Sequence, residues 1–304
     1  MNKPLLLRAA LCAVALAFAL PAMPAFAACD HAAALLKSAY PDAKPGENGL
    51  TVGGLKEEGN YARLIVPDSV GCKVWPANPA LTLLVVPLTE ATPASQDGTN
   101  GDVEIIIADS ATGKPIARRV ETGMAYSDAV QFGDVALDTA RYDLKGDLRA
   151  FGLRTSQSGS SRVNPYFEDA LWLYTYEGGR IRRVLDGLIV MRQNGENNGD
   201  CAGDLVTVKR TISLGPAGPT GYRDLVVAQT ETDATSAKQG DDCKETDEPG
   251  KSRKLVLHFD GKRYVPPAGT KTDIGDPKTD LFSDIMQEET AAPPAASKPA
   301  APKP

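Results

Sequence analysis

The chain has 304 residues, with 33 Lys and Arg against 39 Asp and Glu, so its formal net charge is −6. An acidic chain does not neutralise phosphate groups, which argues against nucleic acid as a partner. The two histidines, His31 and His258, are too few for a histidine-rich metal site, and both are expected to be structural. Nucleotide-binding and G-x-S-x-G motifs are missing from the sequence, so no cofactor is expected.

Residues 1–27 have the three parts of a cleavable secretory signal. Lys3 and Arg8 give a positive start, an apolar run follows, and small residues form a cleavage site at Ala25-Phe26-Ala27. A retained membrane anchor is the alternative. The uninterrupted apolar run from Ala9 to Leu20 is only 12 residues long, whereas a membrane-spanning helix needs roughly 20.

The residues next to the cleavage site leave a second alternative, a lipoprotein acylated at Cys29. Phe26 stands where a lipobox has an aliphatic residue, which favours a soluble product. Removal of the signal leaves 31 basic residues against 39 acidic ones, a net charge of −8. We expect a periplasmic protein, with secretion as the alternative, and no transmembrane anchor after cleavage.

Four cysteines remain after cleavage, and an even number in an exported chain favours disulfides over metal. Cys29 and Cys72 are near in sequence, as are Cys201 and Cys243, and the two pairs are far apart. We therefore expect these two bridges, each stabilising the fold by about 3–4 kcal/mol on the chain-entropy model. A zinc site or a thiol oxidoreductase is disfavoured, because no C-x-x-C motif occurs.

The first element expected after the signal is a short helix, capped by Asp30 and ended at Tyr40 by the proline that follows. From Leu50 onward, short runs rich in β-branched and aromatic residues alternate with Gly, Asn, Asp and Pro clusters, as strands and turns do. Ordinary amphipathic helices do not interrupt these runs, which excludes a βαβ architecture. The candidate strands are Tyr61–Val66, Leu81–Leu88, Val103–Asp109, Ile116–Glu121, Asp147–Thr155, Ala170–Tyr176, Ile181–Leu185, Leu188–Arg192, Asp204–Leu214, Arg223–Thr230, Arg253–Phe259 and Arg263–Val265.

Three segments share one plan, an apolar strand, a glycine-containing turn and a second strand: residues 102–116, 169–181 and 254–264. Glycine supplies the positive φ that hairpin turns require. The intervals between them, 67 and 85 residues, are too uneven for one repeat unit each. The sequence predicts an all-β domain of antiparallel hairpins over residues 28–265, in a propeller-like or a sandwich arrangement.

The densest charged group lies in the segment Ser127–Arg154. Residues 118–192 hold ten arginines and ten acidic residues, so the arginines are expected to be paired or dispersed on a solvated β surface. A functional interpretation places an acid and a base across a cleft. A structural one has Asp capping turns and Arg bridging strands. A polar ligand site is expected here first, with the candidate residues Asp128, Asp134, Asp138, Arg149 and Arg154.

Trp172, Tyr174 and Tyr176 alternate with other residues, and a strand places all three on one face. Such a face usually belongs to the core. An exposed one would form a platform for sugars or peptides, so Trp172 is a further binding candidate.

Asn194, Glu196 and Asn198 place side-chain oxygens at alternate positions before a glycine, as in part of a calcium loop. The twelfth position is Leu205 instead of glutamate, and Cys201 crowds the site. An ordinary hairpin loop is the alternative to calcium, and no other metal site is expected.

Two short motifs resemble a known family. Gly221-Tyr222-Arg223-Asp224-Leu225-Val226-Val227 and Phe259-Asp260-Gly261-Lys262-Arg263-Tyr264 are similar to exported bacterial proteins with FG-GAP-like β-propeller repeats. In that family an acidic calcium loop precedes the first motif, and here Gly215–Thr220 replaces it. The wider chain resembles exported proteins of Gram-negative bacteria, which implies no particular activity.

The folded body is expected to end near Val265, where two prolines break the last strand. Residues 266–290 are predicted to be a linker with a short amphipathic helix, which starts at Asp276-Pro277. The helix either docks on the body or binds a partner. Residues 291–304, rich in Ala, Pro and Lys, are predicted to be disordered. The apolar stripe of the helix consists of Leu281, Phe282, Ile285 and Met286.

No motif above identifies a reaction. We expect a periplasmic or secreted non-catalytic binding or interaction protein, with an unknown envelope or protein partner. The alternative is an envelope-polymer hydrolase that uses carboxylates near Asp128–Arg154. A secreted inhibitor or effector is a third class that the sequence leaves open.

Overall fold

The computed structural model describes residues 29, 31–53, 62–92, 98–240, 242–270 and 280–285. The signal at residues 1–27, the proposed cap Asp30, the helix start at Asp276, Met286 and the tail 291–304 lie outside the described residues. Within the described ranges, no helix has the length and apolar character needed to cross a membrane.

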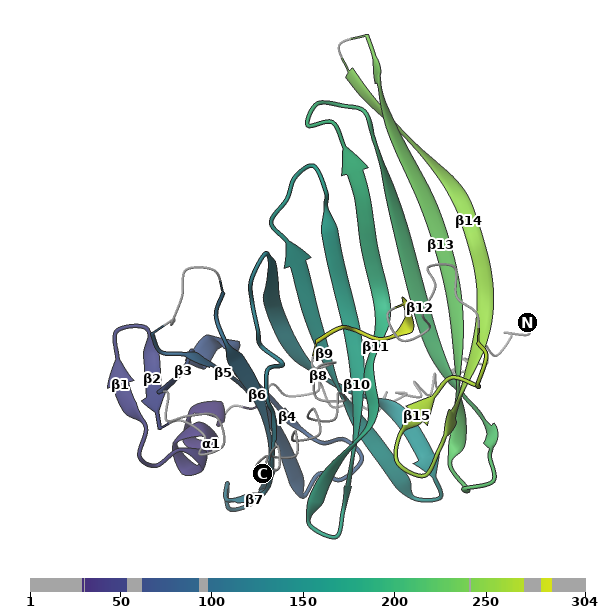
Figure 1. Ribbon diagram of the computed structural model, residues 1–304. Helices are drawn as coiled ribbons and strands as arrows, with labels where there is room; N and C mark the ends of the chain where they lie inside the picture. Colours follow the sequence, from purple (N-terminus) through teal and green to yellow (C-terminus); the bar gives the residue numbers. More distant parts are fainter. Residues whose placement is uncertain are drawn as a thin grey trace, which may run out of the picture.

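Antiparallel strands make up most of the described chain, as the sequence predicts (Figure 1). One α-helix and one short 3-10 helix accompany fifteen strands within the described residues. Their bounds are α1 (Ala32–Ala39), β1 (Lys44–Gly46), β2 (Gly49–Val52), β3 (Arg63–Ile65), η1 (Pro67–Ser69), β4 (Gly71–Val74), β5 (Leu81–Glu90), β6 (Gly101–Asp109), β7 (Pro115–Glu121), β8 (Val130–Lys145), β9 (Leu148–Gly159), β10 (Tyr166–Glu177), β11 (Arg180–Asn197), β12 (Gly203–Ala217), β13 (Arg223–Gln239), β14 (Asp242–Phe259) and β15 (Tyr264–Val265).

The strands form two sheets. The small sheet has the order β1-β2-β3-β5-β6-β7, with β4 added on β5, and the large sheet runs β15 to β8 in sequence order. Every pairing is antiparallel, and each strand of the large sheet pairs with its neighbour in the chain. Of the two arrangements that the sequence leaves open, the structure has the sandwich-like one, because two packed sheets replace the repeated small blades of a propeller.

The two sheets pack face to face around one apolar core. Leu83 and Val85 of β5 point into this core, where they meet Phe151 of β9 and Trp172 of β10. Alternate residues of β5, such as Leu84, point to the opposite face, which α1 covers. Because β5 is buried on both faces, its sequence is a continuous apolar run instead of an alternating one.

Helix α1 begins at Ala32, with His31 at the cap position and no side-chain bond to the helix end. Leu35, Leu36 and Ala39 form its buried face against the small sheet. The predicted disulfide between Cys29 and Cys72 is present, and it ties the start of the helix to β4. Packing and a covalent bridge therefore hold this helix in place.

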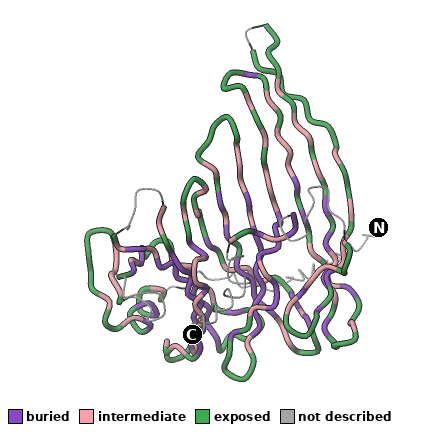
Figure 2. The backbone as a smooth tube through the Cα atoms, viewed as in Figure 1, coloured by how far each residue is buried: buried purple, intermediate pink, exposed green. Residues whose placement is uncertain are grey.

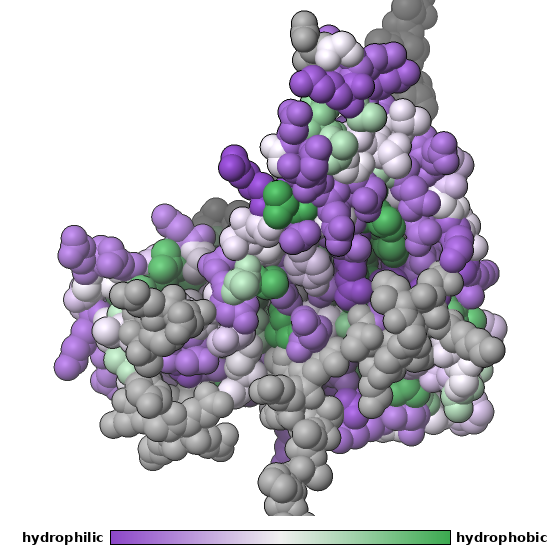
Figure 3. All heavy atoms as spheres, turned by 45° about the horizontal axis from the view of Figure 1, so that its top comes forward, coloured by the Kyte–Doolittle hydropathy of each residue, from purple (hydrophilic) through white to green (hydrophobic). Residues whose placement is uncertain are grey.

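The large sheet extends well beyond its core. Its lower part curls, so that Leu144 of β8 shares a second apolar cluster with Leu225 of β13 and Leu257 of β14. Its upper part, which we call the projecting part, comprises residues 194–206, 231–240 and 242–250, and most of it is exposed (Figure 2). Hydrophilic side chains predominate on the face of this part that Figure 3 shows. The second predicted disulfide, Cys201–Cys243, lies here and links the β11–β12 turn to β14.

Eleven of the fifteen described strands were predicted, several of them shorter than they are. All three predicted hairpins are present, as β6–β7, β10–β11 and β14–β15. The two strands expected at 181–185 and 188–192 are one strand, β11, with an irregular register between them. Strands β1, β2, β4 and β8 were not predicted, and β13 and β14 are much longer than expected.

The described part of the C-terminal stripe docks on the body. Leu281 is fully buried in the cluster of the large sheet, and Phe282 packs against the same cluster. Ile285 contacts the core between the sheets. Of the two expectations for this segment, residues 280–285 fit the docked one.

Candidate binding site

The segment 127–154 forms most of the β8–β9 hairpin, where several of its charged side chains pair with one another. Asp138 Oδ2 accepts hydrogen bonds from Arg154 Nε at 2.8 Å and from the hydroxyl of Tyr142 at 3.0 Å. Burial and the charge of Asp138 raise the pKa of Tyr142, which therefore stays protonated as the donor. Arg154 is 45% exposed, so this group lies on the surface as a cross-strand ion pair.

The other candidates of this segment have similar local roles. Arg149 Nε bonds to Asp143 Oδ1 at 2.5 Å across the β8–β9 register. Asp128 is exposed, and its Oδ1 accepts the backbone N–H of Val130 at 2.8 Å. Asp134 is also exposed. These residues are spread along the length of one hairpin, and they do not converge on any cavity described below.

Trp172 lies in the core between the sheets. This residue is only 2% exposed, and its indole Nε1–H donates a hydrogen bond to Thr155 Oγ1 at 3.0 Å. The guanidinium of Arg183 lies 5.6 Å from the indole ring. Since an exposed ring was the condition for a sugar or peptide platform, Trp172 is a core residue.

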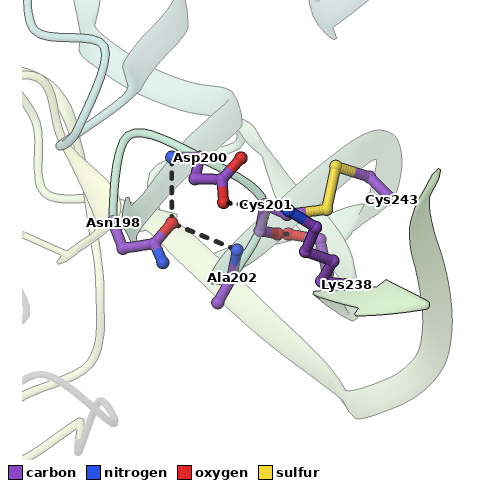
Figure 4. Close-up of a disulfide and its surroundings, with 7 residues drawn as sticks. Asn198, Asp200, Cys201, Ala202, Lys238 and Cys243 are labelled. Atoms are coloured by element: carbon purple, nitrogen blue, oxygen red, sulfur yellow. Dashed lines mark hydrogen bonds and ion pairs between the residues drawn. A yellow bond between two sulfur atoms is a disulfide. The ribbon is translucent and has the colours of Figure 1, made fainter. Parts of the chain in front are cut away.

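The proposed calcium loop is a strand. Asn194 and Glu196 belong to β11, and they pair with Val206 and Asp204 of β12. On an extended strand, side chains two positions apart lie on one face at a spacing of roughly 7 Å. A calcium ion needs all of its oxygen ligands at about 2.4 Å, so such a row does not surround it. Asn198 Oδ1 instead accepts the backbone N–H groups of Asp200 and Ala202 (Figure 4). In the parts of the chain that the structure describes, no cluster of three or more acidic, histidine or cysteine side chains could hold a metal.

A cavity of about 390 Å³ lies between the end of α1 and the small sheet. Such a volume is in the range of small-molecule sites. Charged, aromatic and aliphatic side chains line it together, which is the composition expected of a site that orients a ligand. The lining residues are Ala39, Tyr40, Pro41, Asp42, Ala43, Val52, Gly53, Arg63, Leu88, Glu104 and Arg118.

Glu104 organises the polar side of this cavity. Arg118 donates Nε–H to Glu104 Oε1 at 2.6 Å and Nη2–H to Oε2 at 3.0 Å, in a bidentate pair. The hydroxyl of Tyr40 donates to Oε2 at 2.5 Å. A third bond, from Arg118 Nη1 to the carbonyl of Ala39 at 2.9 Å, joins the pair to the helix end. Glu104 is 5% exposed, so three donors compensate the burial of its charge.

The electrostatics of the group keep Tyr40 and Arg118 protonated at neutral pH. Burial and the neighbouring Glu104 raise the pKa of Tyr40, so the phenol remains a donor. Burial alone would lower the pKa of Arg118, but the hydrogen bond and charge of Glu104 make the net change upward. The guanidinium also lies over the ring of Tyr40, 4.8 Å from its centre. Glu104 therefore fixes a permanently charged arginine at the wall of the cavity.

The remaining wall adds a second guanidinium and apolar surface. Arg63 pairs with Asp102 at 2.8 Å, and both are buried. Val52 and Leu88 supply aliphatic surface. Three of the five N–H groups of Arg118 are used within the protein, so the site can offer donors to an acceptor group on a ligand. The geometry suits a small molecule that has an acceptor at one end and an apolar group at the other.

Sequence reasoning did not find this site, because its residues come from distant parts of the chain. Tyr40 ends the helix, Glu104 lies in β6 and Arg118 lies in β7. One signal was available: Glu104 interrupts the apolar run of residues 103–108 in a strand expected to be central. A carboxylate at such a position requires a partner.

Comparisons with protein-family models, with curated proteins and with solved structures found no match to this chain. The resemblance to FG-GAP-like repeats at residues 221–227 and 259–264 stays a prediction. The structure places the first motif at the start of β13 and the second in the β14–β15 turn.

Proposed function

We propose that this chain is an exported, non-catalytic binding protein that takes a small, partly apolar carboxylate in the cavity between α1 and the small sheet. The observation that carries the proposal is the Glu104–Arg118–Tyr40 group. It holds a charged guanidinium against a cavity of about 390 Å³ whose lining also includes the aliphatic side chains of Val52 and Leu88. Arginine in such a position binds carboxylates through charge and paired hydrogen bonds.

Binding is favoured over hydrolysis by the state of the carboxylates. Glu104 already accepts three hydrogen bonds, so only one of its roughly four lone-pair sites is left for a substrate proton. On the β8–β9 hairpin, Asp138 holds Arg154, and Asp128 closes a turn. The two disulfides support a location outside the cytoplasm, because disulfides persist in oxidising compartments. We propose the periplasm as that location, with secretion as the alternative.

The test is ligand binding by Arg118→Lys, with Arg119→Lys as the matched control. Lysine keeps the charge beside Glu104 but cannot make the bidentate contact. Arg119 is the neighbouring residue of β7, where it pairs with Glu121 at 2.5 Å and does not line the cavity. The probes are monocarboxylates with branched or aromatic tails, each compared with its primary amide, and affinity is measured by calorimetry.

We expect the wild-type protein to bind at least one carboxylate. Its affinity for the matched amide should be lower by a factor of about ten or more. Arg118→Lys should lose about tenfold in affinity for the acid, and Arg119→Lys should not change it. The proposal is wrong if acids and amides bind equally, or if both variants lose affinity to the same extent.

A further inference from the structure

A second polar group lies in the large sheet, on the face that carries Leu225 of β13 and Leu257 of β14. Arg210 of β12, Gln229 of β13 and Arg253 of β14 are directly opposite one another in the strand register. We call these three residues the arginine row. Arg210 is 5% exposed and Gln229 is 3% exposed, so the row is largely shielded from water.

The arginine row has two guanidinium groups but no acid of its own. Arg210 donates Nε–H to Gln229 Oε1 at 2.8 Å and Nη1–H to the carbonyl of Ile189 at 3.0 Å. Burial, opposed by the charge of Asp280, lowers the pKa of Arg210 to about 10. Among the described residues, the carboxylate that forms ion pairs with Arg210 and Arg253 is that of Asp280, which lies outside both sheets. The carboxylate that pairs with these two arginines of the large sheet therefore comes from a segment outside the sheet.

Asp280 enters the arginine row as a ligand would. Its Oδ1 lies 3.3 Å from Arg210 Nη2 and its Oδ2 lies 2.7 Å from Arg253 Nη2, so each oxygen meets one guanidinium. The Asp280 side chain is only 4% exposed. The segment 280–285 crosses the face of the large sheet at mid-height, below the projecting part (Figure 1).

The residues after Asp280 make the contacts of a bound peptide. Leu281 is fully buried, and Phe282 forms a bridge with Leu188 of β11. The backbone N–H of Ser283 donates to the carbonyl of Gly187 at 2.8 Å. A carboxylate anchor, an apolar anchor and main-chain hydrogen bonds are the components of peptide recognition on a sheet.

We propose that Arg210 and Arg253 form a carboxylate-binding site for a short acidic–apolar peptide. Residues 280–285 of this chain fill the site in the isolated protein, and a partner protein's peptide with the order Asp-Leu-Phe exchanges with them. This site is independent of the cavity beside α1. Its ligand class follows from charge complementarity, since the buried Arg210 and the partly buried Arg253 would be strongly unfavourable without a carboxylate.

A free peptide must compete with the effective concentration of the covalently attached segment. The segment is tethered to β15, which ends at Val265, so its binding to the arginine row is intramolecular. Short tethers give effective concentrations of about 1 mM, and a free peptide must compete with that concentration. Weakening the tethered segment should therefore expose the site to free peptide.

The test uses the full mature chain and the N-acetylated, C-amidated peptide Asp-Leu-Phe-Ser-Asp-Ile with a fluorescent label. The control peptide has Asn at its first position. We expect Asp280→Ala to bind the acidic peptide at least tenfold more tightly than the wild-type protein does, and the Asn peptide at least tenfold more weakly than the acidic one. Asp284→Ala is the matched control variant, because Asp284 lies in the same segment and is exposed. It should bind as the wild type does.

A second measurement covers the case in which Asp280→Ala does not fold. Hydrogen exchange of residues 281–283 is followed in the wild-type protein as the acidic peptide is raised into the millimolar range. Exchange should accelerate with the acidic peptide and stay constant with the Asn peptide. No acceleration, or equal effects of the two peptides, overturns the proposal and leaves Asp280 as a fixed structural contact. Neither outcome bears on carboxylate binding at Arg118.

Discussion

Gly187 is the residue on which a dense part of the core depends. It has φ +42°, and a Cβ built at this position would lie 2.6 Å and 2.8 Å from two ring carbons of Trp172. Its carbonyl also receives the N–H of Ser283. Both the backbone conformation and the space above the Cα therefore require glycine.

Gly187→Ala should destabilise the fold by about 2–5 kcal/mol, because a left-handed conformation costs a side chain about 1–2 kcal/mol and the overlap with the indole costs about 1–3 kcal/mol. Gly178→Ala is the control, since Gly178 has a similar φ of +56° and open space around its Cα. It should lose only the backbone part, about 1–2 kcal/mol. Urea unfolding measures both. Equal losses would show that the indole moves aside.

At this scale, sequence reasoning identifies residues better than it identifies their partners. The four bridging cysteines, the turn glycines and the apolar residues of the C-terminal stripe were predicted, because each depends on local sequence. Tyr40, Glu104 and Arg118 were not combined, because 64 residues separate the first two and only the folded sheet brings them together. The prominent charges of residues 127–154 were a poorer guide, since charge density also describes an ordinary solvated hairpin.

The projecting part of the large sheet is an element with little core to stabilise it. Residues 242–249 of β14 are all exposed. The Cys201–Cys243 bridge connects this strand to the turn that follows β11, and Cys201 is buried although its surroundings are not. A cross-link here limits separation of strands that packing does not hold.

Replacing both Cys201 and Cys243 by Ala should destabilise the projecting part by up to about 4 kcal/mol, the chain-entropy value for a loop of 42 residues. The effect should be local. Hydrogen exchange should accelerate over residues 194–206 and 242–250, while Leu225 and Leu257, which are fully buried below them, stay protected.

The control for the bridge is Lys238→Ala in the same region. Lys238 lies 3.9 Å from Asp200, and both side chains are more than half exposed, so this ion pair should contribute less than about 1 kcal/mol (Figure 4). Two outcomes would contradict a local stabilising role for the disulfide. One is a loss of protection that spreads to the core strands in the Cys variant, and the other is an equal loss in the Lys238 variant.

The strands that sequence reasoning missed have a physical explanation. β8 carries charges on both faces, and its register against β9 shifts between Phe132 and Val135 and again between Asp138 and Tyr142, so alternation of apolar residues is lost. The upper part of β14 is exposed on both faces, which removes the apolar signal entirely. Strands of this kind are defined by their neighbours and not by their own pattern.

At the scale of the whole molecule, the two sheets are joined by the apolar core that they share. Trp75 follows β4 of the small sheet, and its ring meets Phe151 of the large sheet at 5.6 Å, edge to face. Phe151 in turn stacks on Tyr174 at 5.8 Å. The sequence predicts antiparallel strands and hairpins, but it contains no signal for which sheet faces pack together, because that choice depends on pairs of residues far apart in the chain.

Because the core is shared, the two sheets should unfold together. The two tryptophans of the chain allow a direct test, since Trp75 adjoins the small sheet and Trp172 belongs to the large one. In Trp75→Phe the fluorescence reports the large sheet, and in Trp172→Phe it reports the region of the small sheet. In each variant the fluorescence midpoint in urea should coincide with the midpoint by circular dichroism, which reports both sheets.

Adding Phe151→Ala to either variant should shift the fluorescence and circular dichroism midpoints by the same amount, because removing this ring costs about 3–5 kcal/mol on the surface that both sheets share. Comparison within each variant avoids the error that tryptophan substitution would introduce between variants. Separate midpoints, with one sheet unfolding before the other, would mean that the core between the sheets does not couple them. The small sheet with α1 would then be a domain with its own stability.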